Sequence, residues 1–199
     1  MSPLKLYSAP LSGNAYKIRL LLAMLGLDYE LINVDLRAGE NLTAEFLRLN
    51  PRGQVPVLVD GDTVIWDSLA ILVYLARRYG DGEWLPTDIP GETQVMQWLA
   101  VSENELLYGL ARARAVVLLK RPFNLEQCQA EGKAGLAVME AHFAENAWLA
   151  AGKPTVADIA CYPYVMLAPM GEISLEPYPN VRQWLTRVEA LPGWVTMEV

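Results

Sequence analysis

The sequence predicts a small mixed α/β layer over residues 1–80, followed by an all-helical part. Strand-like and helix-like segments alternate in the order βαβαββα in the first part, whereas only helical periodicity follows. Residues 1–80 hold 8 basic and 8 acidic side chains, but residues 81–199 hold 8 and 15, which accounts for the whole net charge of -7. Glycine and proline cluster between the parts. We therefore expect domains over residues 1–80 and 91–199, joined by a linker over 81–90.

Composition excludes several classes of protein. The chain has 199 residues, of which 53% are hydrophobic and 20% charged, as is ordinary for a globular protein. No apolar run approaches the roughly 18 residues that span a membrane, and the N-terminus lacks the apolar stretch of a secretory signal. The net charge of -7 argues against a nucleic-acid partner.

Cysteine and histidine usage points to a reducing compartment and to no metal. Cys128 and Cys161 form no CxxC or metal-binding pattern, and such a distant pair indicates reduced, packed thiols. His142 is the single histidine, which excludes a multi-histidine metal site. We therefore expect a cytoplasmic protein without a metal or a tightly bound prosthetic group.

The first 25 residues place a polar loop at the start of a helix. An apolar strand over 4–7 leads into the hydroxyl-rich loop 8–14, and a helix over 15–25 has apolar residues at steps of three and four. The unpaired N–H groups and the dipole at a helix N-terminus favour an anion. The loop is therefore a candidate binding site, although serine and asparagine at such a junction also serve simply as helix caps.

The remainder of the first part reads as a strand, a short helix, a hairpin and a helix. The segments expected are 29–34, 41–49, 55–59 with 63–66, and 68–79. A strand, helix and strand in succession imply a parallel pair with a right-handed crossover.

Pro56 is unusual because it lies in an apolar strand but cannot donate a ladder hydrogen bond. Val55 and Pro56 must therefore lie at an edge, a bulge or a cis turn. A turn would expose the Val55 backbone, which could then pair with an extended peptide. The alternative is a strand-initiating proline without a functional role.

The second part contains helical patterns over 92–119, 124–146 and 180–191, and a further helix after Pro154. Thr155 and Asp158 have the spacing of a capping box at its start. We expect Asp158 to be buried and bonded to backbone N–H groups, so that its replacement by alanine costs about 0.5 to 2 kcal/mol.

Three short stretches carry a resemblance to a known family. They are residues 8–14 (SAPLSGN), 50–58 (NPRGQVPVL) and 66–68 (WDS). Together they resemble the glutathione S-transferase family, in particular its serine-using theta-like or nu-like bacterial members, and the likeness covers essentially the whole chain. It implies a thioredoxin-like first domain, an all-helical second domain with the electrophile pocket, a homodimer, and glutathione as co-substrate.

The resemblance also implies roles for the glutathione-binding residues. In such proteins the residue matching Pro56 is a cis proline, and the residue matching Val55 pairs its backbone with the cysteine of glutathione. The residues matching Asp67 and Ser68 hold the γ-glutamyl end at a helix N-terminus, where a carboxylate and backbone N–H groups suit that ligand.

Two further matching positions depart from the family pattern. Asn41 and Gln54 match positions near the glycine carboxylate of glutathione that often carry histidine or lysine. Both are neutral here, and this bears directly on the affinity for glutathione. Arg52 is a candidate source of the missing positive charge.

Ser12 is the first candidate to stabilise the thiolate of glutathione, because it lies just before the first helix and matches the serine of theta-like transferases. Asn14 is the second candidate, since its amide can also donate a hydrogen bond. Ser8 ranks third, and Tyr7 is expected to turn into the core because it lies one residue too early in the strand. No cysteine occurs in the loop, so no enzyme thiol is expected to form a mixed disulfide.

The predicted function is that of an enzyme, a glutathione S-transferase that serves detoxification. Its bound thiolate attacks a small hydrophobic electrophile. The alternatives are a glutathione-dependent disulfide or peroxide reductase, a non-catalytic glutathione-binding protein, and an interaction module on the same fold. Glutathione binding without catalysis would indicate the non-catalytic binding protein, and the absence of glutathione binding would indicate the interaction module.

Overall fold

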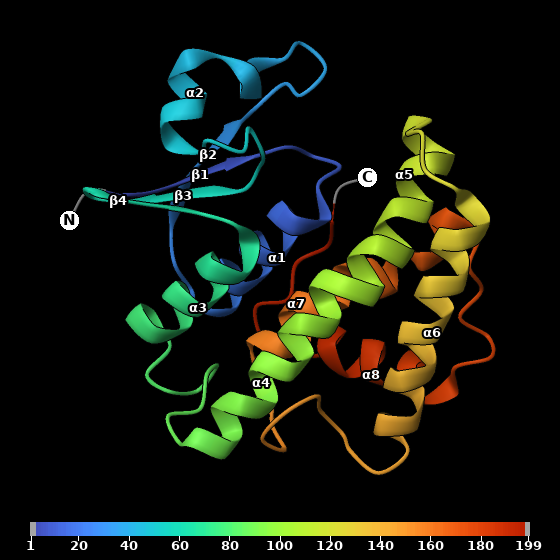
Figure 1. The fold of residues 1–199 in the computed structure, drawn as a ribbon. Coiled ribbons are helices and arrows are strands. Elements are labelled where there is room, and N and C mark those ends of the chain that lie inside the picture. Colours follow the sequence, from blue (N-terminus) through green and yellow to red (C-terminus); the bar gives the residue numbers. More distant parts are fainter. Residues whose placement is uncertain (1–2, 198–199) are drawn as a thin grey trace. The chain divides into compact units, whose positions relative to one another are not determined.

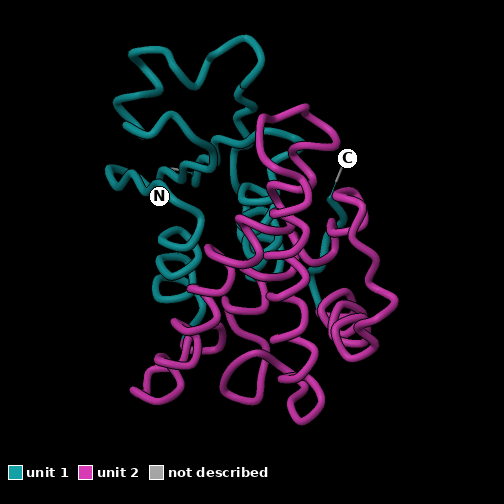
Figure 2. Tube along the Cα trace, turned by 45° about the vertical axis from the view of Figure 1, so that its right-hand side comes forward, with its two compact units in different colours: residues 1–81, 192–199 teal, residues 82–191 magenta. Residues whose placement is uncertain are grey.

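The computed structural model describes residues 3–197, which fall into two compact units (Figures 1 and 2). Unit 1 comprises Met1–Asp81 with Pro192–Val199, and unit 2 comprises Gly82–Leu191. Residues 1–2 and 198–199, which end the two expected domains, lie outside the described residues. The C-terminal segment, expected in the second domain, belongs to unit 1, where the Tyr16 hydroxyl donates to the Val195 carbonyl at 2.6 Å.

Unit 1 contains a four-stranded mixed sheet, and the predicted order βαβαββα is confirmed. Its elements are β1 (Leu4–Ser8), α1 (Gly13–Met24), β2 (Tyr29–Asn33), η1 (Glu40–Leu42), α2 (Ala44–Leu49), β3 (Val57–Asp60), β4 (Thr63–Trp66) and α3 (Ser68–Tyr79). The strands lie in the order β2-β1-β3-β4, with β1 parallel to β2 and the other pairs antiparallel. This is the thioredoxin-like arrangement expected of the first domain.

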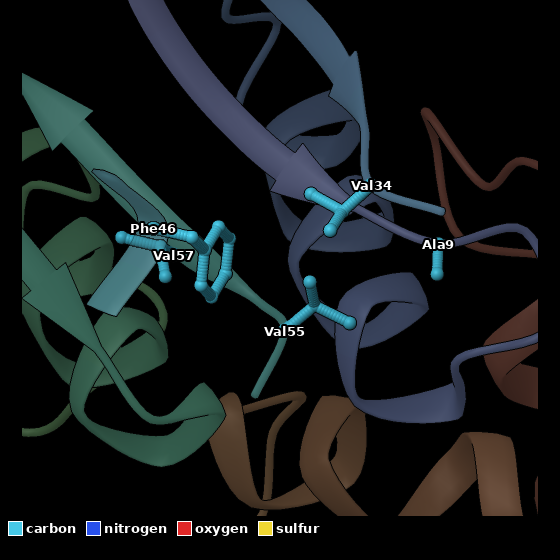
Figure 3. Packing of buried hydrophobic residues seen from close by; sticks show 5 residues of the cluster. All are labelled: Ala9, Val34, Phe46, Val55 and Val57. Atoms are coloured by element: carbon cyan, nitrogen blue, oxygen red, sulfur yellow. The ribbon is translucent and has the colours of Figure 1, made fainter. Parts of the chain in front are cut away.

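Side chains alternate between the two faces of this sheet. Leu6 and Leu58 are fully buried on the face covered by α1 and α3 (Figure 1). On the opposite face the Tyr7 ring lies edge-on to the ring of Phe46 from α2, with 6.0 Å between the ring centroids. Tyr7 therefore packs against the core, as predicted. The buried cluster on this face consists of Ala9, Val34, Phe46, Val55 and Val57 (Figure 3).

Unit 2 is all-helical, as predicted. It contains α4 (Ile89–Val101), η2 (Ser102–Ala111), α5 (Arg112–Leu119), α6 (Leu125–Phe143), α7 (Val156–Met166), η3 (Ala168–Gly171) and α8 (Pro179–Glu189). Within residues 3–197, no helix is both long and apolar enough to cross a membrane.

The helix expected over 92–119 contains a π-helical segment, η2, between α4 and α5. This segment crosses α6 at backbone contact, because a Cβ atom on Gly109 would lie 2.2 Å from the Gly132 amide nitrogen. Glycine on both sides therefore permits an approach that no larger residue allows. Helical periodicity in the sequence does not reveal the π segment.

Asp158 connects three segments of unit 2 through its carboxylate. Its Oδ1 accepts from the Leu149 amide at 3.1 Å and from the Trp184 indole N–H at 2.9 Å. Its Oδ2 accepts from the amide of Thr155 at 2.9 Å and from the hydroxyl of the same residue at 3.2 Å. The side chain is fully buried. The expectation of a buried Asp158 bonded to backbone N–H groups is therefore confirmed. The bond from the Trp184 indole, which was not expected, also connects Asp158 to α8.

We predict that Asp158→Ala lowers the free energy of unfolding by about 3 kcal/mol or more, beyond the cost of a simple cap. The substitution leaves the N–H groups of Leu149, Thr155 and Trp184 buried without an acceptor, and each such group costs about 1 to 3 kcal/mol. Urea unfolding measures this loss. Asp88→Ala is the matched control, because Asp88 is an exposed cap with one bond to the Gly91 amide at 2.8 Å; about 1 kcal/mol is expected. Equal losses in the two variants would contradict the prediction.

The same carboxyl makes stability depend on pH. Burial raises the pKa of Asp158 from 3.8 to about 6, although the hydrogen bonds that its carboxylate accepts act to lower the pKa. Because the folded protein holds this proton more tightly than the unfolded chain, the stabilisation is complete below about pH 4 and is lost as pH rises through about 6. The stability of the parent relative to Asp158→Asn should therefore fall by about 3 kcal/mol across this window. Urea unfolding of both proteins at several pH values checks this. A relative stability that rises with pH would contradict it.

Candidate functional site

The register of the sheet brings three loops of unit 1 to one edge. β3 is antiparallel to both neighbours and pairs Val57 with Tyr7 of β1 and with Trp66 of β4. The end of β1, the start of β3 and the end of β4 therefore lie side by side. Loop 9–12, loop 50–56 and the start of α3 adjoin these three points. The fold thus gathers the three stretches that carry the expected site residues.

Ser12 is the N-cap of α1. Its Oγ accepts a hydrogen bond from the Ala15 amide at 3.2 Å, and the side chain is half-buried. A serine hydroxyl can accept and donate at once, so this bond fixes Oγ and leaves its O–H able to donate. Ser8, the third candidate, lies in β1 and is only 2% exposed. The geometry therefore favours Ser12 over Ser8 as a donor.

Asn14 lies in the first turn of α1, two residues after Ser12. Its Oδ1 is buried and, among residues 3–197, has no hydrogen-bond partner. A buried polar atom without a partner is costly and commonly marks a position that a ligand or water completes. Asn14 is therefore placed to take part in the same site.

Loop 50–56 is shaped by Asn50, whose role was not predicted from the sequence. Asn50 is buried, its Nδ2 donates to the Gln54 carbonyl at 2.7 Å, and its Oδ1 accepts from the Arg52 amide at 2.9 Å. Asparagine commonly bonds the backbone two residues on. The Asn-Pro pair at positions 50 and 51, directly after the helix expected over 41–49, is the sequence signal for this turn.

The Val55–Pro56 peptide bond is cis, as the family resemblance implied. The Val55 side chain packs in the cluster beneath the loop (Figure 3). Within residues 3–197, no backbone hydrogen bond to Val55 is found outside its local turn, and β3 begins only at Val57. The Val55 amide and carbonyl are therefore available to an extended peptide, in the manner of strand addition.

Asp67 and Ser68 begin α3. Asp67 has φ +80° and caps the helix by accepting from the Leu69 amide at 3.0 Å through Oδ1. Its Oδ2 lies 3.2 Å from Nη1 of Arg52. Ser68 is 3% exposed and is the first helical residue. A carboxylate, a hydroxyl and the N-terminal N–H groups of a helix are thereby brought together.

The two neutral candidates both adjoin Gly53, Asn41 through a hydrogen bond and Gln54 as the next residue. Asn41 directs its Nδ2 to the Gly53 carbonyl at 2.7 Å. Gln54 is exposed, and its backbone carbonyl is held by Asn50. Neither side chain brings a charge, and the guanidinium of Arg52 is directed to Asp67.

The described part of the chain contains no group of three or more His, Cys, Asp or Glu side chains placed to hold a metal ion. Cys128 and Cys161 are buried in helices of unit 2 as free thiols. The side chains at the three loops of unit 1 are hydroxyls, amides, one carboxylate and the guanidinium of Arg52. Such groups suit a polar organic ligand.

Comparison with known proteins shows where this arrangement belongs. The model of the glutathione S-transferase N-terminal domain matches residues 2–77, and that of the C-terminal domain matches residues 115–192. Glutathione S-transferase 3 of Zea mays is 36% identical over 206 aligned positions, which cover 98% of this chain and 92% of the relative. The chain belongs to the glutathione S-transferase family.

Further family members resemble the chain over nearly its whole length. The crystal structure of a possible glutathione S-transferase from Rhodopseudomonas palustris has a TM-score of 0.93 and 37% identity, and covers 100% of this chain and 99% of its own. A glutathione transferase homologue from Lodderomyces elongisporus was solved with two glutathione molecules per subunit. It has a TM-score of 0.87 and 26% identity, and the match covers 97% of this chain and 96% of that chain.

A relative with a different activity is also found. Disulfide-bond oxidoreductase YfcG of Escherichia coli is 31% identical over 204 aligned positions, which cover 94% of this chain and 91% of the relative. The predicted family, fold and enzyme class are thus confirmed by the comparisons. The theta-like or nu-like subtype and the roles of single residues stay predictions.

We predict that Asp67→Asn keeps most of the stability of the parent, whereas Asp67→Ala loses about 1 kcal/mol or more. Asparagine can still accept from the Leu69 amide and tolerates positive φ, but alanine does neither. Urea unfolding measures the difference. Two variants of equal stability would show that the cap contributes nothing at this position.

Proposed function

We propose that this member of the family is a glutathione transferase, in which the thiolate of bound glutathione attacks a small hydrophobic electrophile. The observation that carries the proposal is the Ser12 hydroxyl, which is fixed by the Ala15 amide and still has its O–H to donate. The open backbone of Val55 and the start of α3 at Asp67 and Ser68 support the same ligand.

The chemistry requires a thiolate, and glutathione supplies little of it unaided. A free thiol has a pKa of about 8.5, so only about 3% is ionised at pH 7. A hydrogen bond to a charged acceptor contributes about 1.5 to 3 kcal/mol, which lowers this pKa by roughly one to two units. One well-placed donor therefore raises the ionised share of the bound thiol at pH 7 from about 3% to roughly 24–76%.

Ser12 is the donor that we assign to this thiolate. It precedes α1 directly, so the positive end of the helix dipole acts on the same anion. Asn14 is the second candidate, because it lies in the first turn of α1 and its side-chain Nδ2 can donate a hydrogen bond. The two side chains can share the role.

The bond changes follow from the nucleophile. The sulfur lone pair forms a carbon–sulfur bond to the electrophile, and the electron pair of the bond that breaks leaves with the displaced group or moves to an acceptor atom within the electrophile. The product is a thioether of glutathione. We assign the glutathione-binding role to residues 1–80, the linker to 81–90, and the electrophile pocket to the helical domain over 91–199.

A glutathione-dependent disulfide or peroxide reductase is the second candidate. The relative from Escherichia coli that is named a disulfide-bond oxidoreductase favours it. The loop over residues 8–14 contains no cysteine, so the same activated glutathione thiolate would attack sulfur or oxygen in place of carbon. Attack on a disulfide would give a mixed disulfide and release one thiolate, whereas attack on a peroxide would give the sulfenic acid of glutathione and release an alcohol or water. A second glutathione would then convert either product to oxidised glutathione, with release of a thiol or of water.

We further propose a cytoplasmic homodimer that acts in detoxification, with no metal. The free thiols of Cys128 and Cys161 suit a reducing compartment. Ile89 and Met96 are 82% and 41% exposed on one side of α4. Apolar side chains at this spacing suit a surface that a second copy covers.

The deciding experiment is an ultraviolet titration of the thiol of bound glutathione. We predict that Ser12→Ala raises this thiol pKa by about one to two units, because one charge-assisted hydrogen bond is lost. Ser12→Thr is the matched control, because threonine keeps the hydroxyl and can still cap the helix. With this variant, the pKa of the bound glutathione thiol should stay near that measured with the parent. Asn14→Ala should give a smaller rise.

An unchanged thiol pKa in Ser12→Ala would remove Ser12 from this role. Conjugation of an aromatic halide and reduction of a mixed disulfide, measured on the same proteins, then separate the two candidate functions. Faster turnover of the disulfide than of the halide would favour the reductase.

A further inference from the structure

A cavity in unit 2 lies among residues to which no functional role has been assigned. Its volume is about 380 Å³, within the range of small-molecule sites, and it lies between α4, the end of α6 and the segment 146–152. Every residue that lines it belongs to unit 2. We propose that this cavity is a second binding site, which takes a small uncharged nitrogen heterocycle of the nucleobase type. The inference does not depend on the proposed glutathione chemistry.

Three aromatic side chains line the cavity. Trp98 of α4 and His142 of α6 are in edge contact, with 4.7 Å between the ring centroids and 63° between the ring planes. The His142 ring is also held through Nε2, which lies 3.0 Å from the carbonyl oxygen of Trp148, the third aromatic residue. Proteins bind unstacked nucleobases by stacking them on such rings. The lining therefore suits a flat heterocycle.

Two amide side chains in the lining are fixed so that one can donate to a ligand and the other can accept. Gln94 accepts from the Ala151 amide through Oε1 at 3.0 Å, which leaves its Nε2 able to donate. Asn146 donates from Nδ2 to the His142 carbonyl at 3.0 Å, which leaves its Oδ1 able to accept. A ring nitrogen beside an amino group, as on the edges of adenine, presents the complementary acceptor and donor.

The charge of the lining favours an uncharged ligand. Among the described residues that line the cavity there is no Lys, Arg, Asp or Glu, although residues 81–199 hold 8 basic and 15 acidic side chains. A carboxylate or phosphate would lose water in this cavity without meeting an opposite charge, which is costly. A neutral heterocycle has no such cost. We therefore expect a base in preference to a phosphorylated nucleotide.

The cavity lies on a different side of α4 from the surface that we propose for dimerisation. Gln94 and Trp98 line the cavity and are four positions apart, so they share one face of the helix. Met96 is two positions from each of them and therefore lies on the opposite side, where it is exposed together with Ile89. A second copy that covers Ile89 and Met96 would leave the cavity open.

Isothermal titration calorimetry with three purines tests the inference on the intact chain. Adenine should bind once per chain with a dissociation constant of about 1 mM or lower. Purine, which lacks the amino group, should bind about three- to tenfold more weakly, because one neutral hydrogen bond is lost. Purine-6-carboxylate carries a charge in place of the amino group and should bind at least about tenfold more weakly than adenine.

A competing ligand separates this cavity from the glutathione site. The adenine titration is repeated with S-hexylglutathione at saturation, so that the proposed glutathione site and the adjoining space for an electrophile are occupied. The dissociation constant of adenine should be unchanged, because the two ligands bind at different places.

Three variants show whether the cavity is responsible. Gln94→Glu keeps the shape of an exposed side chain but replaces its donor with a charged oxygen, and should weaken adenine at least about tenfold. Trp148→Leu removes one ring but keeps the backbone carbonyl that holds His142, and should weaken adenine at least about fivefold. Gln183→Glu is the matched control, because Gln183 is exposed on α8 outside the cavity; its affinity should equal that of the parent.

The absence of adenine binding to the parent would overturn the inference, and so would equal affinities of Gln94→Glu and the parent. Displacement of adenine by S-hexylglutathione would also overturn it, because adenine would then occupy the glutathione site or its surroundings. Failure of the proposed function gives a different result, in which glutathione and S-hexylglutathione do not bind while adenine still does.

Discussion

The antiparallel pairing of β3 with both β1 and β4 is the constraint on which the proposed site depends. Val57 is paired with Tyr7 on one side and with Trp66 on the other. The end of β1, the start of β3 and the end of β4 therefore lie at the same edge of the sheet. A shift of one residue in either ladder would turn every side chain of β3 to the opposite face. The Val55 side chain would then leave the buried cluster on the α2 face, and the loop that precedes Val57 would lose its place beside α1. Core packing and site geometry are thus fixed by the same register.

Local patterns in the sequence account for most of the fold. The strands and helices of unit 1 follow from alternation, turn residues and helical steps, and the cis bond before Pro56 followed from a short motif that resembles the family. The features that were missed depend on contacts between distant residues. The close crossing of the π-helical segment with α6 requires the opposition of Gly109 and Gly132, which are 23 positions apart in the sequence. The return of the C-terminal segment to unit 1 involves Tyr16 and Val195, which no periodicity connects.

The family resemblance and the helix starts in the sequence selected Ser12, Asp67 and Ser68 as candidates, and the structure has all three at helix starts. Their roles in a site stay predictions. The sequence did not show that Asn50 bonds the backbone of Arg52 and Gln54 in its loop, or that Arg52 is directed to Asp67. Those two facts decide the shape of the loop and the position of its only guanidinium. Side-chain pairing across the tertiary structure has no short-range signature in a single sequence.

The neutral composition of residues 1–80 determines how they can stabilise an anion. Their charges cancel, with 8 of each sign, so a bound thiolate gains nothing from the net charge of this segment. What remains is local, namely the dipole of α1 and the donors at Ser12 and Asn14. A helix terminus contributes about 0.3 to 1 kcal/mol and a hydrogen bond to a charged acceptor about 1.5 to 3 kcal/mol. Their sum of about 2 to 4 kcal/mol lowers a thiol pKa by roughly 1.3 to 3 units, which ionises roughly 40–97% of the thiol at pH 7. Because these contacts act at short range, ionic strength should affect the step much less than it affects exposed ion pairs.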